Sequence, residues 1–410
     1  MVVFAHTPPP FHGQSRMVQL MLEGLANRRS RPGKAANATG SDTPGLAGDS
    51  ALECYHVNAR LSRDLQDVGS ARWQKAIVLL GCCLRAIWLR LRYRPAAFYF
   101  VPAAPLRASL YRDWLVMLLC RGFFRYTVYH WHAVGLGQWL QARAAWWERR
   151  ISHALMDRVD LAIVLSEFNQ ADAQEFRPRK VAVVPNGIPD PCPDYERTIG
   201  PRRAIRVEQR RRILAGAQPE DQDAAVVRVL FLAHCTRDKG LFDAIEGVRR
   251  ANQQLADQGS RVHLQLLVAG GFRNHSERAE LERLLAEPEA ARWLRYMGFA
   301  GPQAKAAAFE QADLFCFPTY FASEGQPLTL LEAMAFGLPI VTTRWRSIPQ
   351  LLPPDYPGLV EPRHPEQVAK GLLALLAASG SCLRQTFVKR FTLEHHLTAL
   401  TTALENVPAG

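Results

Sequence analysis

The sequence predicts an α/β protein made of two doubly wound domains, each built around a parallel sheet. Short apolar runs alternate with amphipathic segments along all 410 residues, as expected for repeated strand–helix–strand units. A chain of this length exceeds one ordinary hydrophobic core, so two domains of about 190 residues each are expected. A stretch rich in proline and charge, residues 191–222, separates the apolar runs into two groups.

Each predicted strand is an apolar run bounded by polar or turn-forming residues. In the first half we expect strands at Val2–Ala5, Leu52–Val57, Ala97–Val101, Tyr126–His130, Leu161–Leu165 and Val181–Val184. In the second half we expect them at Val226–Ala233, Val262–Ala269, Asp313–Pro318, Leu338–Thr342 and Gly358–Val360. These groups predict an N-terminal domain at 1–190, a linker at 191–222, a C-terminal domain at 223–382, and a final helix at 383–410 that packs back towards the N-terminal domain.

The positive charge is concentrated in the first half of the chain. Residues 1–190 carry 24 Lys and Arg against 14 Asp and Glu, which is +10 of the formal +12. This favours an acidic partner, such as an anionic membrane surface or a lipid-linked phosphate. Arginine and tryptophan alternate in two predicted helices, 85–94 and 142–150, and this composition suits peripheral contact with a membrane. No nucleic-acid-binding motif accompanies the arginines, so nucleic acid is not an expected partner.

The cysteines and the chain's apolar segments indicate a cytoplasmic location. The eight cysteines show neither a C-x-x-C pair nor metal-ligand spacing, which is typical of free thiols in a reducing compartment. The N-terminus enters a predicted strand at once and lacks the layout of a signal peptide. Arginines interrupt the longest apolar windows, 76–91 and 114–124, which are too short to span a bilayer. We therefore expect a cytoplasmic protein with peripheral contact at the inner face of the cytoplasmic membrane.

The most informative stretch of the chain has a carboxylate at each end, Glu324 and Glu332. It follows a predicted strand, and Pro327 suits the first position of a helix. The first amides of a helix have no partner within it, so the stretch predicts an anion site. Glu332 falls among apolar residues of that helix, where a charge has no evident structural role. With an anion site between them, the carboxylates are better interpreted as ligand holders than as the paired acids of a glycoside hydrolase.

Two further segments of the second domain could contact the same anion. Lys239 precedes Gly240 at a predicted helix start, where the ammonium could reach a diphosphate and the glycine permits close backbone approach. Arg237 is a second cation that could share this role. The alternative interpretation is that Lys239 and Arg237 belong to a solvated basic turn that binds no ligand. Gly270 ends the next predicted strand, at the edge where open α/β sheets bind ligands, although an ordinary turn explains it equally well.

In the first domain, candidate residues follow two predicted strands. Gly13 joins the first strand to a helix and permits close approach of a phosphate, with a structural turn as the alternative. His130 and His132 stand two apart at the end of another strand and therefore point the same way. No neighbouring Asp, Glu or Cys completes a metal site, so we expect no metal. A substrate contact by one of the two, or an ordinary core or surface histidine, are the remaining interpretations.

Taken together, these segments resemble the retaining glycosyltransferases of family 4, and the resemblance extends over nearly the whole chain. The residues that carry it are 324–339, the segment Val184-Pro185-Asn186-Gly187-Ile188, the pair Lys239-Gly240, and the segment Gly358-Leu359-Val360-Glu361-Pro362. The first of these is long and highly specific. The resemblance implies the GT-B fold, in which two Rossmann-like domains face each other across a cleft.

The resemblance also implies a role for each candidate residue. Glu324 and the amides of Gly325, Gln326 and Pro327 would hold hydroxyls of a donor sugar. Leu328 and Thr329 would meet the phosphate at the helix start, and Glu332 would accept from the ribose hydroxyls. Lys239 would neutralise the leaving diphosphate, with Gly13 approaching it from the other domain, and His132 would lie beside the reacting sugar.

The implied reaction is transfer of a sugar, with retention, from a nucleoside-diphosphate sugar to a glycan or lipid-linked acceptor in cell-surface glycan synthesis. It requires neither a cofactor nor a metal. The chain departs from the family pattern at His234, where an arginine is usual and Arg237 could substitute, and at Gln350, where a glutamate is usual. A sugar-nucleotide epimerase on the same fold and a non-catalytic nucleotide-sugar-binding partner of a synthase complex are the alternatives.

Overall fold

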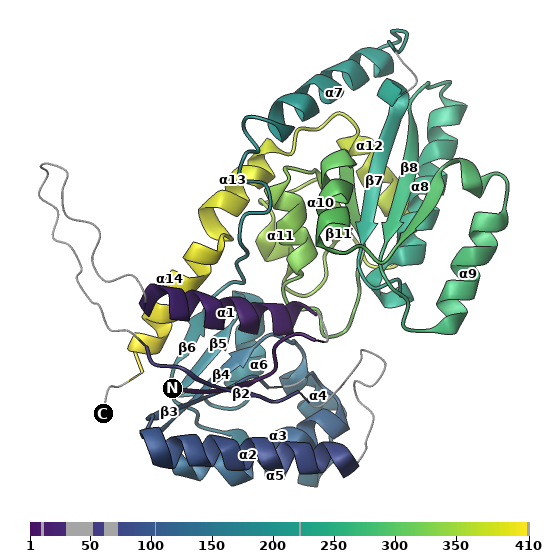
Figure 1. The fold of residues 1–410 in the computed structure, drawn as a ribbon. Coiled ribbons are helices and arrows are strands. Elements are labelled where there is room, and N and C mark those ends of the chain that lie inside the picture. The colour runs from purple at the N-terminus through teal and green to yellow at the C-terminus, as the bar shows by residue number, and fades with distance from the viewer. Residues whose placement is uncertain (10–11, 30–51, 61–72, 103, 221–222, 408–410) are drawn as a thin grey trace, which may run out of the picture. The chain divides into compact units, whose positions relative to one another are not determined.

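The computed structural model describes residues 1–9, 12–29, 52–60, 73–102, 104–220 and 223–407. The chain forms two compact units, the first comprising residues 1–185 together with 396–410 and the second residues 186–395. Each unit has a parallel sheet with helices on both faces (Figure 1). The expected α/β class with two doubly wound sheets is therefore confirmed. Within the described residues, no helix is both long enough and apolar enough to cross a bilayer.

The first unit contains a six-stranded sheet in the order β2-β1-β3-β4-β5-β6. Its strands are β1 (Val2–Ala5), β2 (Tyr55–Asn58), β3 (Ala97–Phe100), β4 (Tyr126–Trp131), β5 (Leu161–Val164) and β6 (Val181–Val183). All neighbouring pairs are parallel. The strand order reverses between β1 and β3, and such a reversal is where open α/β sheets bind ligands.

Alternate residues of these strands enter two separate cores, one on each face of the sheet. Val2 and Phe4 pack into one core, and Val3 and Ala5 into the other. The first core is covered by α2 (Trp73–Tyr93), α3 (Arg107–Cys120), α4 (Leu136–Ala142), α5 (Trp146–Met156) and α6 (Gln170–Gln174). The second core is covered by α1 (Gly13–Arg29) and the end of α14 (Leu393–Glu405), so the C-terminal helix packs on the N-terminal strands.

The second unit contains a six-stranded sheet in the order β12-β11-β10-β7-β8-β9. Its strands are β7 (Val226–Leu232), β8 (His263–Ala269), β9 (Leu294–Gly298), β10 (Leu314–Phe317), β11 (Ile340–Thr343) and β12 (Leu359–Val360). Its helices are α7 (Ile199–Leu214), α8 (Leu241–Asp257), α9 (His275–Ala286), α10 (Pro302–Gln311), α11 (Leu328–Ala335), α12 (Pro365–Leu375) and α13 (Ser381–Arg390). All strands are again parallel, and the order reverses between β7 and β10.

The structure differs from the sequence prediction in two respects: it contains one strand that the sequence pattern did not indicate, and its unit boundaries lie at other residues. Strand β9 lies at the edge of its sheet and exposes most of its residues, so it lacks the continuous apolar run of the other strands. The second unit begins at Asn186, and the chain returns to the first unit at His396, inside α14. Helix α7, which lies within the expected linker 191–222, packs on the second unit.

A buried ion cluster fixes α7 to the second sheet. Asp313, just before β10, is 8% exposed and pairs with Arg206 at 2.9 Å and with Arg210 at 2.8 Å. Its second carboxylate oxygen accepts the backbone N–H of Arg228. Burial raises the pKa of Asp313, but the charges of Arg210 and Arg206 outweigh burial, so the net pKa is lowered.

We expect Asp313→Ala to lower the free energy of unfolding by about 3 kcal/mol near neutral pH, because Arg210 then stays buried without its carboxylate. The lowered pKa means that the carboxylate stabilises the fold above its ordinary pKa and that this stabilisation is lost as the pH falls below about 4. Urea unfolding at two pH values tests both statements. Glu282→Ala, which removes an exposed pair with Arg278, should leave stability nearly unchanged.

Candidate functional site

The loops that follow β7 and β10 meet where the strand order of the second sheet reverses. Lys239 ends a short 3₁₀ turn, Arg237–Lys239, after β7, and Glu324 lies in the loop between β10 and α11. Lys239 Nζ donates to Glu324 Oε2 at 2.6 Å, and Thr319 Oγ lies 3.1 Å from the same oxygen. Two residues that the sequence predicted as ligand-binding, 85 positions apart, are thus brought together.

Gly240 allows this approach. Its φ is +83°, and a Cβ atom at this position would lie 2.2 Å from the carbonyl oxygen of Pro318, at the end of β10. No other residue fits so close to that carbonyl in this left-handed conformation. Lys239 Nζ also lies 4.3 Å from the centre of the Phe321 ring. The glycine therefore serves the packing of two loops, and the aromatic face adds to the attraction for the ammonium.

Side chains from the end of β11 and the residues just after it bind carbonyl groups at the end of β10 and in the β10–α11 loop. Four donors do this: Thr342 to Phe317, Thr343 to Thr319, Trp345 to Phe321, and Ser347 to Gly325. Buried carbonyl groups without partners would be costly, so these bonds give the loop one conformation. They keep Glu324 and the first turn of α11 in a fixed place.

Gln326 contributes its side chain to the loop's own structure. Its Oε1 atom accepts the backbone N–H of Asn186 at 2.8 Å, while Asn186 Nδ2 donates to the Gln326 carbonyl oxygen at 3.2 Å. This reciprocal pair explains why an asparagine follows Val184-Pro185 in the sequence. Two buried polar atoms of the pair, Gln326 Nε2 and Asn186 Oδ1, have no partner within the described part of the chain.

Helix α11 begins at Leu328, and Pro327, which the sequence predicted as the first helical residue, is instead the extended residue that precedes the helix. Leu328 and Thr329 are partly exposed, whereas Gly325 and Pro327 are buried. The first amides of the helix therefore lie next to Glu324 with no partner inside the helix. Glu332, one turn further on, pairs with Lys305 of α10, so its charge does have a structural role, contrary to expectation.

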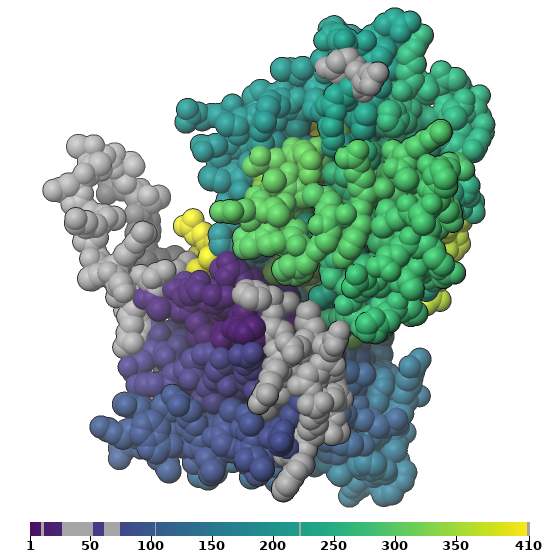
Figure 2. All heavy atoms as spheres, turned by 45° about the vertical axis from the view of Figure 1, so that its right-hand side comes forward, coloured from purple at the N-terminus to yellow at the C-terminus, as the bar shows by residue number. Residues whose placement is uncertain are grey.

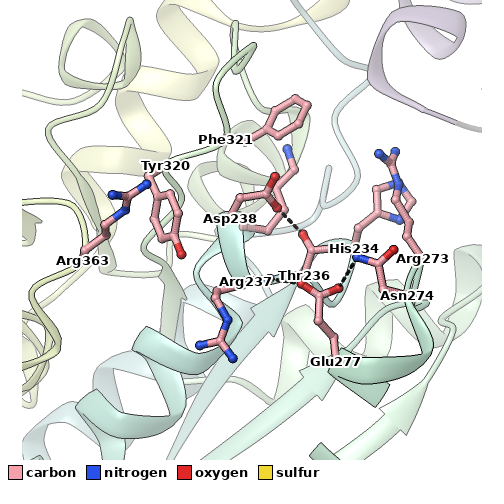
Figure 3. Close-up of a pocket in the computed structure, with 11 residues that line it drawn as sticks. His234, Thr236, Arg237, Asp238, Arg273, Asn274, Glu277, Tyr320, Phe321 and Arg363 are labelled. Carbon is pink, nitrogen blue, oxygen red and sulfur yellow. Dashed lines mark hydrogen bonds between the residues drawn. The ribbon is translucent and has the colours of Figure 1, made fainter. Parts of the chain in front are cut away.

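Beside Lys239 the second unit has a pocket of about 470 Å³ (Figure 3). Its lining includes four cations, Arg237, Lys239, Arg273 and Arg363, against two carboxylates, Asp238 and Glu277. Glu277 accepts the backbone N–H of Arg237. The excess of positive charge favours an anionic ligand.

Arg273 lies beside His234 in this pocket, while Arg237 points to the other side (Figure 3). Arg237 binds Glu280 of α9 at 2.6 Å and is half-exposed, so its charge is already compensated. Burial, followed by the charges of Arg273 and Lys239, lowers the pKa of His234 to about 4. His234 is therefore neutral at pH 7, and Arg273 provides a cation that the sequence patterns did not indicate.

Gly270 has a structural reason to be glycine. Its φ is +151°, and a Cβ atom would lie 1.8 Å from the carbonyl oxygen of Ala233. Its own carbonyl oxygen accepts the hydroxyl of Tyr296 at 2.8 Å. Gly270 thus allows the backbone after β8 to pack closely against the backbone after β7, and it determines the direction of the loop that carries Arg273.

In the first unit, His130 and His132 differ in accessibility. His130 is buried and its Nδ1 atom bonds to the hydroxyl of Tyr99, while His132 is half-buried. Their rings lie 4.2 Å apart between centroids. Desolvation, with the nearby His396 and His12, lowers the pKa of His132 to about 3, so this imidazole is neutral at pH 7. Of the two, His132 is the one that a ligand could reach.

Gly13 is the exposed first residue of α1, and the residue before it caps the helix. His12 Nδ1 accepts the backbone N–H of Ser15 at 3.3 Å, and the Ser15 hydroxyl bonds back to the His12 carbonyl oxygen. His12 also lies 2.7 Å from His6, between their Nε2 atoms. At least one backbone N–H at the start of this helix is therefore already hydrogen-bonded within the chain.

Across the residues that the structure describes, no three His, Cys, Asp or Glu side chains form a group that could hold a metal ion.

Residues 227–378 match the sequence profile of the family described as "Glycosyl transferases group 1". Over 169 residues the chain is 31% identical to WcaL of Escherichia coli (strain K12), a glycosyltransferase assigned to colanic acid biosynthesis, covering 39% of this chain. Over 155 residues it is 28% identical to the amylovoran biosynthesis glycosyltransferase AmsK of Erwinia amylovora, covering 37% of this chain. The matches span only 38% and 36% of the lengths of these two relatives.

Among solved structures, the fold is similar to that of a sucrose-phosphate synthase from Thermosynechococcus elongatus. The TM-score is 0.65 at 17% identity, over 99% of this chain and 98% of the other. It is also similar to Anabaena HepE in complex with UDP-glucose, with a TM-score of 0.61 at 14% identity over 98% and 99% of the two chains. The likeness along nearly the whole length confirms the expected GT-B fold class.

We expect Gly270→Ala to lower the free energy of unfolding by about 3 kcal/mol, because the new Cβ would collide with the Ala233 carbonyl in a backbone conformation that strains other residues. Denaturant unfolding measures this loss. Gly271→Ala is the matched control, since no atom lies within 4 Å of its Cβ position. An equal loss in both variants would contradict the assignment of the contact.

Proposed function

We propose that this chain, whose residues 227–378 match the glycosyl transferases group 1 family, transfers a sugar from a nucleoside-diphosphate sugar to a hydroxyl of a glycan or lipid-linked acceptor. The observation that carries the proposal is the meeting of Lys239 and Glu324 at the strand-order reversal of the second sheet, next to the start of α11. A cation, a carboxylate and free helix amides at one point suit a ligand that has both a diphosphate and a sugar.

In the ligand-free protein, Lys239 and Glu324 form an ion pair with each other. In this pair the carboxylate stands where we expect the donor's phosphate, and the ammonium stands where we expect its sugar hydroxyls. When the donor enters, sugar hydroxyls donate to Glu324 in place of the ammonium. Phosphate oxygens accept from Lys239 in place of the carboxylate. After the exchange Lys239 is ion-paired with the phosphate and Glu324 accepts hydrogen bonds from the hydroxyls, so neither charge is left without a partner in the low-dielectric loop region. Gln326 Nε2, which is buried without a partner in the described structure, can donate to a further sugar hydroxyl.

The diphosphate would lie against the start of α11 and the cationic pocket. The amides of Leu328 and Thr329 face it as outward donors, and Lys239 neutralises its charge. Arg273 takes the part that the family pattern gives to an arginine at position 234, because it lines the same pocket beside His234. Glu332, held by Lys305, accepts from the ribose hydroxyls.

The reaction that we propose proceeds with retention through an oxocarbenium-like transition state. The bond between the anomeric carbon and the diphosphate oxygen breaks while the acceptor oxygen bonds to the same face of that carbon. Lys239 and the helix amides stabilise the negative charge that grows on the departing diphosphate, whose oxygen takes the proton of the acceptor hydroxyl. His132 is proposed to lie beside the reacting sugar. No step requires a metal or a cofactor.

The names of the relatives support an acceptor in cell-surface polysaccharide synthesis. WcaL is assigned to colanic acid biosynthesis and AmsK to amylovoran biosynthesis. A cytoplasmic protein that meets the inner face of the membrane would reach both a nucleotide-sugar and a lipid-linked acceptor. HepE was solved with UDP-glucose, which makes UDP-sugars the first donors to test.

We expect Lys239→Ala and Glu324→Ala each to lower the rate of nucleoside-diphosphate release by about 100-fold or more, because each removes a contact that the donor makes during bond breaking. Release is measured over a panel of nucleotide-sugars, with and without a membrane extract as acceptor source. Exposed residues of the same unit provide the controls Lys370→Ala and Glu310→Ala, which should retain full activity.

The same panel distinguishes the alternatives. Release that depends on the extract supports glycosyl transfer. Epimerised sugar-nucleotide formed without an acceptor would point to an epimerase, and donor binding without any turnover would point to a non-catalytic partner. Thermal unfolding of each variant shows whether lost activity reflects lost structure, since the paired residue stays partly buried after either substitution.

We expect Arg273→Ala to raise the KM for the donor by about tenfold, because it removes one charged contact with the diphosphate. Arg237→Ala should leave the KM nearly unchanged, because that guanidinium is engaged by Glu280. Each variant removes one positive charge from the same pocket, but only the Arg237 guanidinium is paired with Glu280. A larger KM effect at Arg237 would reverse the assignment.

A further inference from the structure

Helix α2 of the first unit is apolar on two opposite faces. Leu79, Cys83, Ala86 and Leu89 are buried in the core beneath the sheet. A second series faces outward at helical spacing: Ile77, Leu80, Leu84, Trp88 and Leu91. Leu84 and Leu91 are each 67% exposed and Trp88 is 54% exposed. We call this outward series the α2 stripe.

Other exposed apolar side chains lie on neighbouring helices of the same layer. Helix α3 packs against both α2 and α5, and the three cover one face of the first sheet (Figure 1). Leu118 of α3 is 66% exposed and Trp146 of α5 is 72% exposed. In Figure 2 the blue residues of this region form the lower surface of the unit. Large exposed apolar groups gathered on one layer are uncommon in a soluble protein without a partner surface.

The charges on this layer are nearly all positive where they meet solvent. Helices α2, α3 and α5 contain only two acidic residues, Asp113 and Glu148, and both are buried. Asp113 pairs with Arg112 and Glu148 with Arg107. Besides Arg107, which pairs with Glu148, the exposed arginines of the three helices are Arg85, Arg92, Arg149 and Arg150. Among the described residues, these four form no ion pair or side-chain hydrogen bond, and Arg92 contacts the Tyr93 ring.

We propose that the α2 stripe, with the arginines beside it, is a surface that docks onto an anionic lipid bilayer, with α2 lying in the plane of the membrane. The leucines and Trp88 enter the boundary between headgroups and acyl chains, and the arginines meet lipid phosphates. Arg85, Arg90 and Arg92 prevent the helix from crossing the bilayer. A second copy of the chain is disfavoured, because a symmetric contact would bring two arginine-rich faces together.

This inference rests on the proposed function only for the reason why the protein would bind a membrane, which is that a lipid-linked acceptor lies there. Binding itself is tested separately from catalysis, with the full chain and sedimentable vesicles. We expect binding to vesicles of phosphatidylcholine with phosphatidylglycerol, weaker binding to phosphatidylcholine alone, and a decrease with added salt. Nucleotide-sugar turnover is measured in the same preparations without vesicles.

The variant that tests the surface is Leu84→Ser/Trp88→Ser/Leu91→Ser, which alters only exposed side chains. Its partition onto anionic vesicles should fall at least about tenfold, because the apolar area that enters the lipid is lost. The matched control replaces three exposed apolar residues of the second unit, Ile205→Ser/Phe299→Ser/Val388→Ser, and should bind as the wild type does. Arg85→Glu/Arg92→Glu should remove the preference for anionic lipid.

Three outcomes would overturn the proposal. The first is wild-type protein that stays in the supernatant with anionic vesicles at low salt. The second is an equal loss of binding in the control variant. The third is a wild-type dimer, seen by light scattering, that the α2 variant converts to a monomer without altering vesicle binding, since the stripe would then contact a second copy. Donor turnover in the absence of vesicles should be unchanged in all these variants, so failure of this proposal and failure of the proposed function are distinguishable.

Discussion

The pairing of β7 with β10 is the constraint on which the candidate site depends. These strands are neighbours in the sheet although the segments β8 and β9 separate them in sequence. Their loops therefore leave the same edge side by side, and Gly240 lets one loop contact the carbonyl at the end of the other. The ion pair of Lys239 with Glu324 follows from this contact. The donors at and just after the end of β11 then bind further carbonyl groups of the β10 loop, so that three strand ends together position one carboxylate and one helix start.

Local patterns in the sequence were sufficient for most of the fold. Eleven of the twelve strands are apolar runs that could be recognised individually, and the helix at 328 followed from Pro327. Strand β9 was missed because an exposed edge strand needs no apolar run. The positions where the chain passes between units were not readable from composition. Helix α7 looks like linker because it is rich in arginine, yet those arginines bind Asp313 and backbone carbonyls of the second unit.

The candidate site was predictable in its residues but not in their partners. Sequence spacing indicated Lys239 and Glu324 separately, whereas their contact requires a strand order that no local pattern contains. The same limit applies to Glu332, whose partner Lys305 lies on another helix. Arg273 was missed because it follows Gly270 and Gly271 in a loop without a periodic signal. The paired glycines at the base of this loop were the available hint.

The C-terminal helix has a consequence for how the protein is made. Leu400, Ala403 and Leu404 of α14 belong to the core that also contains Val3 and Ala5 of the first strand. The first unit therefore cannot complete that core during synthesis until α14 has been translated, whereas the core of the second unit is complete by Phe391. The domain that begins the sequence is the last to be finished. Until α14 has been synthesised, part of one face of the first unit's sheet stays uncovered.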